Sequence, residues 1–174
     1  MNAIPVGPDY AGPKALPVVS LGANLNTARH NPVPGMMGKS HLACALSYAT
    51  CQAGHSGLFT TAVDIINTLT AAQAACRLKA ELKRFLAPEG LCVDEVGYLP
   101  IDKTGADLLF QVISQRYEHG SIILTTNQAY KHWARIFNND STLTSAVLDR
   151  LLHHAETVII EGKSYRMKDQ IKAP

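Results

Sequence analysis

The feature that most constrains the fold of this chain is residues 35–43, where a turn containing glycine leads into a helix-like pattern. Its Gly38-Lys39-Ser40 sequence has the form of the end of a phosphate-binding loop. In such a loop, backbone N–H groups at a helix N-terminus surround a phosphate, a lysine reaches the terminal phosphates, and a hydroxyl binds Mg²⁺. A chance tripeptide that begins an ordinary helix would look the same, so a second feature is needed.

A pair of carboxylates supplies that second feature. Asp94 and Glu95 follow a short apolar run that is typical of a buried strand. Ligands of open α/β sheets bind at the carboxyl ends of the strands. We therefore expect Asp94 to hold Mg²⁺ through water and Glu95 to orient or deprotonate an attacking water. A solvated acidic turn is the simpler alternative, but the two features in this order favour a nucleotide site.

Strand and helix patterns alternate along the chain from residue 39. Apolar runs predict strands at 57–61, 91–95, 121–127 and 157–160, and helical spacing predicts helices at 39–53, 62–86, 103–119, 130–137 and 142–154. This alternation predicts an α/β fold, a doubly wound parallel sheet with helices on both faces. The helix over 62–86 should break near the alanines at 71–75, and Ser141 or Thr142 should cap the last helix.

Four further polar residues are of interest. Asn127 ends a predicted strand and should hydrogen-bond the attacking water or the γ-phosphate, although turn formation alone also explains an Asn there. Arg150 either pairs with a nearby acid or projects into a neighbouring subunit's nucleotide site to neutralise charge. His153 and His154 are adjacent on one predicted helix, so we do not expect both to face one ion.

Composition limits the class of protein. With 174 residues and 47% apolar content, the chain can form one domain with a sizeable core. It has no apolar run long enough to span a membrane and no leader pattern, so we expect a cytoplasmic protein. The four cysteines lack Cys-x-x-Cys spacing and should be small buried thiols. The net charge of +2 permits a nucleic-acid partner, and basic residues over 77–84 form a face that either contacts DNA phosphates or is merely solvated.

Residues 1–34 do not fit the regular pattern. They are rich in proline and glycine, and only 16–21 resembles a strand. A phosphate loop needs a strand immediately before it, but polar residues and Pro32 separate that run from Gly35. We favour a displaced or poorly ordered segment over a first strand at 16–21 with a long connection. The predicted division is therefore an irregular segment at 1–34 and a core at 35–174.

Several blocks of the chain resemble one known family. These blocks are 38–43, 59–62, 94–100, 105–111, 126–127, 148–154 and 162–166. Together they closely resemble IstB-like ATP-binding proteins, helper ATPases encoded by bacterial insertion sequences and related to the DnaC helicase loaders. The resemblance implies a P-loop NTPase with an AAA+ core and no full helical lid. It also implies an ATP- and Mg²⁺-dependent, DNA-binding homo-oligomer that assists a transposase.

The resemblance also implies roles for single residues. The expected cofactor-binding residues are Gly35, Gly38, Lys39, Ser40, His41 and Arg166, the last as a second phosphate sensor. Ser40 and Asp94 would hold the metal, and Asp94 with Glu95 would form the Walker B pair. Asn127 matches the sensor residue, and Arg150 matches the finger that acts in trans.

Two departures from the family are expected to affect ATP use. Val33 and Met36 stand where the family has glycine, and their side chains should crowd the phosphates because only glycine tolerates positive φ and close approach. Hydrolysis therefore depends on whether the altered loop is competent. A truncation or frame change upstream, with loss of the central strand, would explain residues 1–34. The alternatives are a DnaC-like loader of the replicative helicase and a non-catalytic remnant that binds DNA or sister subunits.

Overall fold

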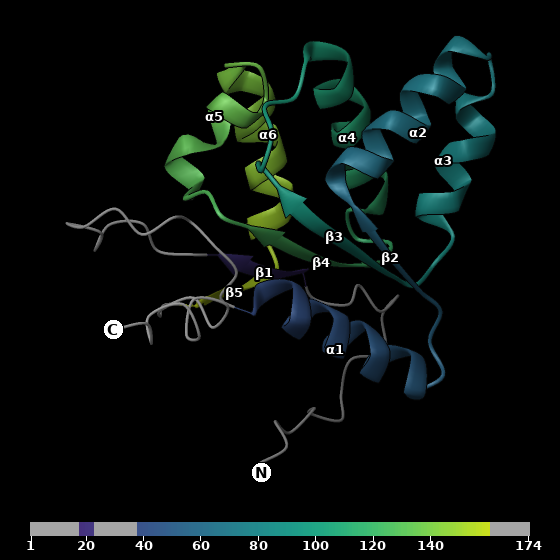
Figure 1. Cartoon of the computed structure of the whole chain (residues 1–174), viewed down its shortest axis with the longest axis vertical. Coiled ribbons are helices and arrows are strands. Elements are labelled where there is room, and N and C mark those ends of the chain that lie inside the picture. Colours follow the sequence, from purple (N-terminus) through teal and green to yellow (C-terminus); the bar gives the residue numbers. More distant parts are fainter. Residues whose placement is uncertain (1–17, 23–37, 161–174) are drawn as a thin grey trace, which may run out of the picture.

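The computed structural model describes residues 18–22 and 38–160, which form one parallel sheet with helices on both faces (Figure 1). The strands are β1 (Val18–Gly22), β2 (Gly57–Thr61), β3 (Gly90–Val96), β4 (Ser121–Thr126) and β5 (Ala155–Ile159). The helices are α1 (Lys39–Gln52), α2 (Ala62–Ala74), α3 (Leu78–Leu86), α4 (Lys103–Arg116), the 3-10 turn η1 (Tyr130–His132), α5 (Trp133–Ile136) and α6 (Ser141–Leu152).

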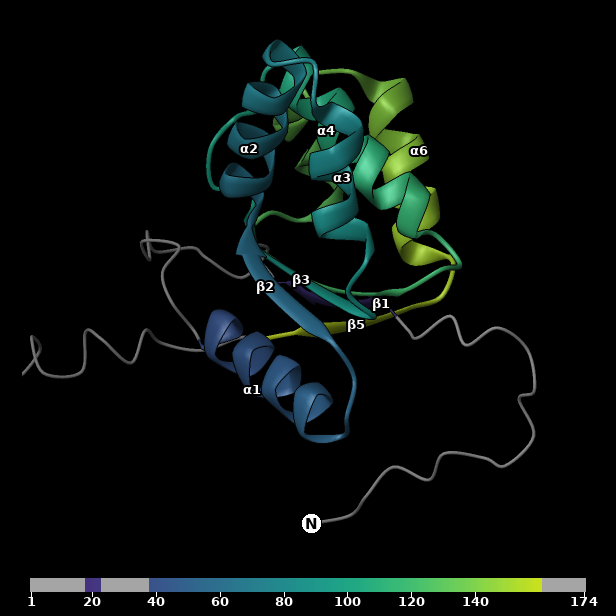
Figure 2. The ribbon, with the colours of Figure 1, turned by 90° about the vertical axis from the view of Figure 1, so that its right-hand side faces the viewer.

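The sheet has five strands in the order β2-β3-β4-β1-β5, and every pair is parallel. Among the described elements, helix α1 covers one face and α2 to α6 cover the other (Figure 2). Because parallel strands need crossover connections, helices on both faces follow from the alternating order of elements. The predicted doubly wound α/β architecture is confirmed.

Strand β1 corrects the interpretation of the N-terminal segment. It lies inside the sheet between β4 and β5, with Val19 opposite Ile123 and Leu21 opposite Val158. The favoured prediction of a displaced segment, with the central strand lost, is wrong for these residues. The alternative of a first strand at 16–21 agrees with β1. The proposed boundary at residue 34 lies outside the described residues.

Local chemistry explains where most helices begin and end. The predicted break between α2 and α3 is present, with Cys76 in the left-handed region at a φ of 56°. Asp102 caps α4 by accepting a hydrogen bond from the backbone N–H of Gly105 at 2.8 Å. Asp140 caps α6 in the same way, so the prediction that Ser141 or Thr142 would be the cap is wrong.

The two faces of the sheet carry cores of different size. Against α2, α4 and α6 lies a large cluster that includes fully buried Trp133 and Phe137. On the α1 face the buried pair is Ala43 and Cys92, with Ile123 packed beside it. The site elements at the start of α1 are therefore carried by the less extensively packed face.

Only one cysteine follows the prediction of buried thiols. Cys92 lies inside the sheet, and burial raises its pKa to about 12. Cys44, Cys51 and Cys76 are exposed, so the prediction is wrong for them. Two of these lie on α1, whose outward face is largely uncovered by other described elements. None of the helices in the described ranges combines the length and hydropathy needed to cross a membrane.

Candidate nucleotide-binding site

The predicted loop and acid pair meet at the carboxyl edge of the sheet, where the parallel strands end. Ser40, in the first turn of α1, donates a hydrogen bond from Oγ to Oδ1 of Asp94 at 3.0 Å. Asp94 lies near the end of β3 and is only 7% exposed. The two predicted metal ligands, 54 positions apart in the chain, are therefore in direct contact.

Gly38 sets the direction in which α1 begins. Its backbone lies in the left-handed region, with φ 81° and ψ 8°, which side chains with a Cβ rarely adopt. It precedes the helix without providing a side-chain cap, so the amide groups of the first turn lack the usual capping oxygen. Uncapped N–H groups at a helix N-terminus are the donors that bind phosphate.

Lys39 adds a cation to this edge. Its side chain is half-buried, and burial lowers its pKa below the usual value, while the negative charge of Asp94 opposes this shift. The ammonium group therefore lies in the field of the Asp94 carboxylate. A phosphate bound here would stabilise the charged form of Lys39, which burial disfavours by removing water.

Thr125, on the neighbouring strand β4, is a site residue that the sequence analysis missed. Its hydroxyl donates a short hydrogen bond to Oδ1 of Asp94 and accepts one from the backbone N–H of Glu95 at 3.0 Å. Thr125 thus fixes both the carboxylate and the backbone that follows it. The available signal was a pair of threonines that follows the apolar run of this strand.

Glu95 occupies a strained position beside the buried acid. Its φ is 60°, and the pairing of β3 with β4 shifts register between Val93 and Val96, as at a β-bulge. The bulge leaves Asp94 buried and Glu95 exposed, so adjacent carboxylates have different environments. A non-glycine residue in the left-handed region costs about 1–2 kcal/mol, and such strain clusters at functional sites.

Asn127 follows β4 at the same edge. Its Oδ1 atom is buried and has no hydrogen-bond partner within the described part of the chain. A buried acceptor without a partner is uncommon and calls for a ligand or water. Together with the Ser40 hydroxyl, the Asp94 carboxylate and the Lys39 cation, it fits a Mg²⁺–phosphate group, because Mg²⁺ takes oxygen ligands and substrate phosphates.

Arg150 is not brought to this edge. It lies in the last turn of α6, where Nη1 donates to the carbonyl of Ala146 at 2.9 Å and the guanidinium lies 5.1 Å from the Phe110 ring centroid. Helix α6 leads into the start of β5 and packs on the opposite face of the sheet from α1 (Figure 2). No ion pair joins Arg150 to an acid among the described residues, so the predicted acid pairing is not found there.

The remaining predicted site residues divide into two groups. His41 is an exposed residue of α1, next to Ser40. Gly35, Arg166, and the departures Val33 and Met36 lie outside the described residues. Their roles, and the crowding expected from the two departures, stay predictions.

The strand order, the Gly-Lys-Ser turn that starts α1 and the buried acid on β3 define a P-loop domain of the AAA+ class. Solved structures agree with this fold. One titled DnaI has a TM-score of 0.69 at 15% identity, covering 88% of this chain and 78% of that chain. A DnaC helicase loader has a TM-score of 0.62 at 24% identity, covering 83% and 77%. At this level of identity the likeness shows the fold alone.

The sequence comparison identifies the family. Residues 31–173 match the model of the family described as IstB-like ATP binding protein, and the chain belongs to that family. A putative ATP-binding protein of insertion sequence IS21 from Pseudomonas aeruginosa is 43% identical over 140 residues, which are 80% of this chain and 52% of that protein. One of IS5376 from Geobacillus stearothermophilus is 42% identical over 137 residues, 79% and 54% respectively. The chain thus spans about half the length of these relatives.

Proposed function

We propose that this protein is a cytoplasmic helper ATPase of transposition, which binds ATP with Mg²⁺ and assists a transposase on DNA. The observation that carries the proposal is the hydrogen bond between Ser40 at the start of α1 and Asp94 on β3. It joins the two motifs that a Mg-triphosphate would bridge. The names of the relatives, insertion-sequence ATP-binding proteins, support the biological setting.

Each residue of the site has a binding role in this proposal. Lys39 contacts the terminal phosphates, and the amide groups that follow Gly38 surround them. The Ser40 hydroxyl and the Asp94 carboxylate hold Mg²⁺, with Thr125 keeping the carboxylate in place. The metal would neutralise charge on the phosphate oxygens.

Hydrolysis requires a positioned water. Glu95, exposed beside the buried Asp94, takes the proton of that water, and Asn127 orients it through its unpaired Oδ1. Arg150 belongs to α6, which packs on the opposite face of the sheet from α1, and in this proposal it acts on the nucleotide of a neighbouring subunit. The protein therefore works as a homo-oligomer in this proposal.

DNA binding is assigned to the basic side of α3. Lys79, Lys83 and Arg84 are exposed, whereas Leu82 and Phe85 of the same helix are buried. A helix anchored by its apolar side can offer such cations to phosphates. Replacing Lys83 and Arg84 by alanine should reduce the slope of log affinity against log salt by about 0.9 for each lost phosphate contact. An unchanged slope would remove this helix from the DNA interface.

The decisive experiment measures ATP affinity in the presence of Mg²⁺ for the protein and for Lys39→Ala. We expect at least a tenfold loss in the variant. Lys103→Ala is the matched control, since Lys103 is the first residue of α4 as Lys39 is of α1, and it should leave affinity unchanged. Equal, negligible binding by the protein and by Lys39→Ala would instead support a non-catalytic remnant.

A further inference from the structure

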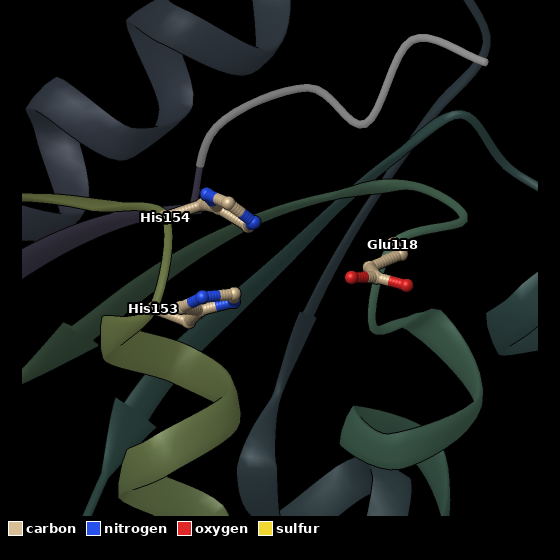
Figure 3. A group of neighbouring side chains, drawn as sticks. All are labelled: Glu118, His153 and His154. Atoms are coloured by element: carbon tan, nitrogen blue, oxygen red, sulfur yellow. The ribbon is translucent and has the colours of Figure 1, made fainter. Parts of the chain in front are cut away.

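Two turns at the amino edge of the sheet, where the strands begin, bring together a group of potential metal ligands (Figure 3). Glu118 lies in the turn between α4 and β4, and His153 and His154 lie in the turn between α6 and β5. One ligand atom from each lies within 4.8 Å of the others. Figure 3 shows the imidazole rings of His153 and His154 one above the other, with the carboxylate of Glu118 opposite them.

The end of α6 explains why adjacent histidines converge. The expectation that they could not face one ion assumed a helix that continues through residue 154. Helix α6 ends at Leu152, His153 caps it with helical backbone angles, and His154 follows in the turn, where the two ring centroids are 4.1 Å apart. Successive residues within a helix are rotated by about 100° about its axis and point in different directions. Because the chain leaves the helix at His154, this rotation does not separate the two side chains. That expectation is therefore wrong in its premise.

A hydrogen bond from outside the group orients one of the rings. The Tyr117 hydroxyl lies 2.7 Å from Nδ1 of His153. This contact leaves Nε2 of His153 for a ligand and holds the ring in one plane. Histidines that bind metals in proteins almost always use their second nitrogen in this way, with a partner that fixes the tautomer and the ring orientation.

We propose that Glu118, His153 and His154 bind one divalent transition-metal ion of the zinc class. Two imidazoles and one carboxylate are a known zinc donor set, which leaves a fourth position for water. Tetrahedral coordination needs ligand atoms about 3.4 Å apart, from metal–ligand bonds of about 2.0–2.1 Å. All three side chains are exposed, so rotation of their terminal groups can close the remaining distance.

The site is separate from the nucleotide site. Glu118 and the histidines precede β4 and β5, whereas Asp94 lies towards the end of β3, at the opposite edge of the same parallel sheet. A bound ion would tie the end of α4 to the end of α6. The proposal does not depend on ATP binding, so either one can fail without the other.

The test is Zn²⁺ binding by untagged protein whose exposed thiols have been alkylated, in excess Mg²⁺ and in competition with a chromophoric chelator. Alkylation is needed because Cys44, Cys51 and Cys76 are exposed and would bind zinc. We expect one tight site per chain and a rise in the thermal midpoint with Zn²⁺. His153→Ala, His154→Ala and Glu118→Gln should each weaken binding at least tenfold and abolish the rise.

Two further variants sharpen the result. His119→Ala removes an exposed histidine next to Glu118 that is outside the group, and it should bind zinc as the unmodified protein does. Tyr117→Phe should weaken binding about tenfold or more by freeing the ring of His153. Equal zinc binding by the protein and by all three ligand variants would overturn the site. Full binding by Glu118→Gln alone would overturn the three-ligand arrangement.

Discussion

Asp94 and Arg116 are both buried charged side chains, at 7% and 2% exposure, and neither forms a salt bridge within the described residues. Their partners differ in kind. The carboxylate of Asp94 accepts hydrogen bonds from two side-chain hydroxyls, those of Ser40 and Thr125. The guanidinium of Arg116 donates to backbone carbonyls of Phe85, Leu86, Pro88, Glu89 and Ser121.

This difference separates a charge that holds elements of the fold together from one that the proposed function assigns to the nucleotide site. The carbonyls around Arg116 belong to the end of α3, to the turn that leads into β3 and to the start of β4, so one side chain joins these three segments. Gly120 leaves room for it, since a Cβ there would lie 2.7 Å from Nη2. Burial lowers the pKa of Arg116, and its Nη1 and Nη2 groups both donate to carbonyls, whereas the buried Nε has no partner within the described residues. At Asp94 both hydroxyls donate to the same oxygen, Oδ1, so the second oxygen of the carboxylate can receive a cation.

The largest effect is expected for Arg116→Met, which removes the hydrogen bonds from the guanidinium to the surrounding carbonyls. The free energy of unfolding should fall by about 3–5 kcal/mol, because several hydrogen bonds from a charged donor are lost together and each contributes about 1.5–3 kcal/mol. Urea unfolding measures it. The control Arg135→Met, at an exposed arginine, should stay within about 0.5 kcal/mol. A loss below about 1 kcal/mol would contradict the structural role.

Asp94→Asn should affect ATP affinity strongly and stability little, the opposite of Arg116→Met. We expect at least a tenfold loss of Mg²⁺-dependent ATP affinity, about 1.4 kcal/mol, because the metal loses an anionic ligand. The free energy of unfolding should change by less than about 1 kcal/mol, since the amide oxygen still accepts hydrogen bonds. Calorimetric titration and urea unfolding test the two parts. Asp107→Asn, at an exposed position on α4, should change neither, and a large loss of stability in Asp94→Asn would erase the contrast with Arg116.

Glu95→Gly should stabilise the protein while abolishing hydrolysis. Glycine removes the cost of a left-handed backbone, so the free energy of unfolding should rise by about 1 kcal/mol. ATP binding should persist, because Glu95 acts on water in the proposal rather than on the nucleotide. Asn138→Gly is the control: its φ is 52°, but asparagine tolerates this region, so the gain should be smaller. Destabilisation by Glu95→Gly would argue against strain at the bulge.

The smallest effect is the pH dependence of ATP affinity. Burial lowers the pKa of Lys39 in the free protein, and bound phosphates should raise it again. The contribution of Lys39 is therefore complete below its free-state pKa and is lost as pH rises through that value towards the bound-state pKa. Affinity should be constant near neutrality and weaken in the alkaline range below 10.5. Lys39→Arg should lose this dependence, since an arginine stays protonated there.

The sequence predicted the parts of the fold that depend on local pattern. Strand β2 has the predicted bounds, and β3 and β4 agree to within a residue or so, because apolar runs between helices leave little freedom. Strand β1 was harder to predict, because it is a run of five residues in a proline-rich segment. It becomes part of the sheet only by pairing with β4 and β5, which are distant in the sequence. Asp140 was missed as a cap because three polar residues in a row compete for that position.

The site shows the same division between local and distant information. Ser40 and Asp94 follow from motifs, and the structure places them in contact. Thr125 hydrogen-bonds Asp94, and Arg116 hydrogen-bonds the carbonyl of Phe85. In each case the partner is 31 positions away in the chain, so no local sequence pattern reveals the contact. Glu95 was assigned correctly to the end of β3, but its left-handed backbone depends on a bulge that a single sequence does not display.

The place of Arg150 on α6, across the sheet from α1, has a consequence for how such a protein would be switched on. If the residue serves a neighbour, then catalytic competence is a property of each junction between chains and not of a chain. Dilution would silence the protein without unfolding it. Assembly on a scaffold such as DNA would then determine where ATP is hydrolysed.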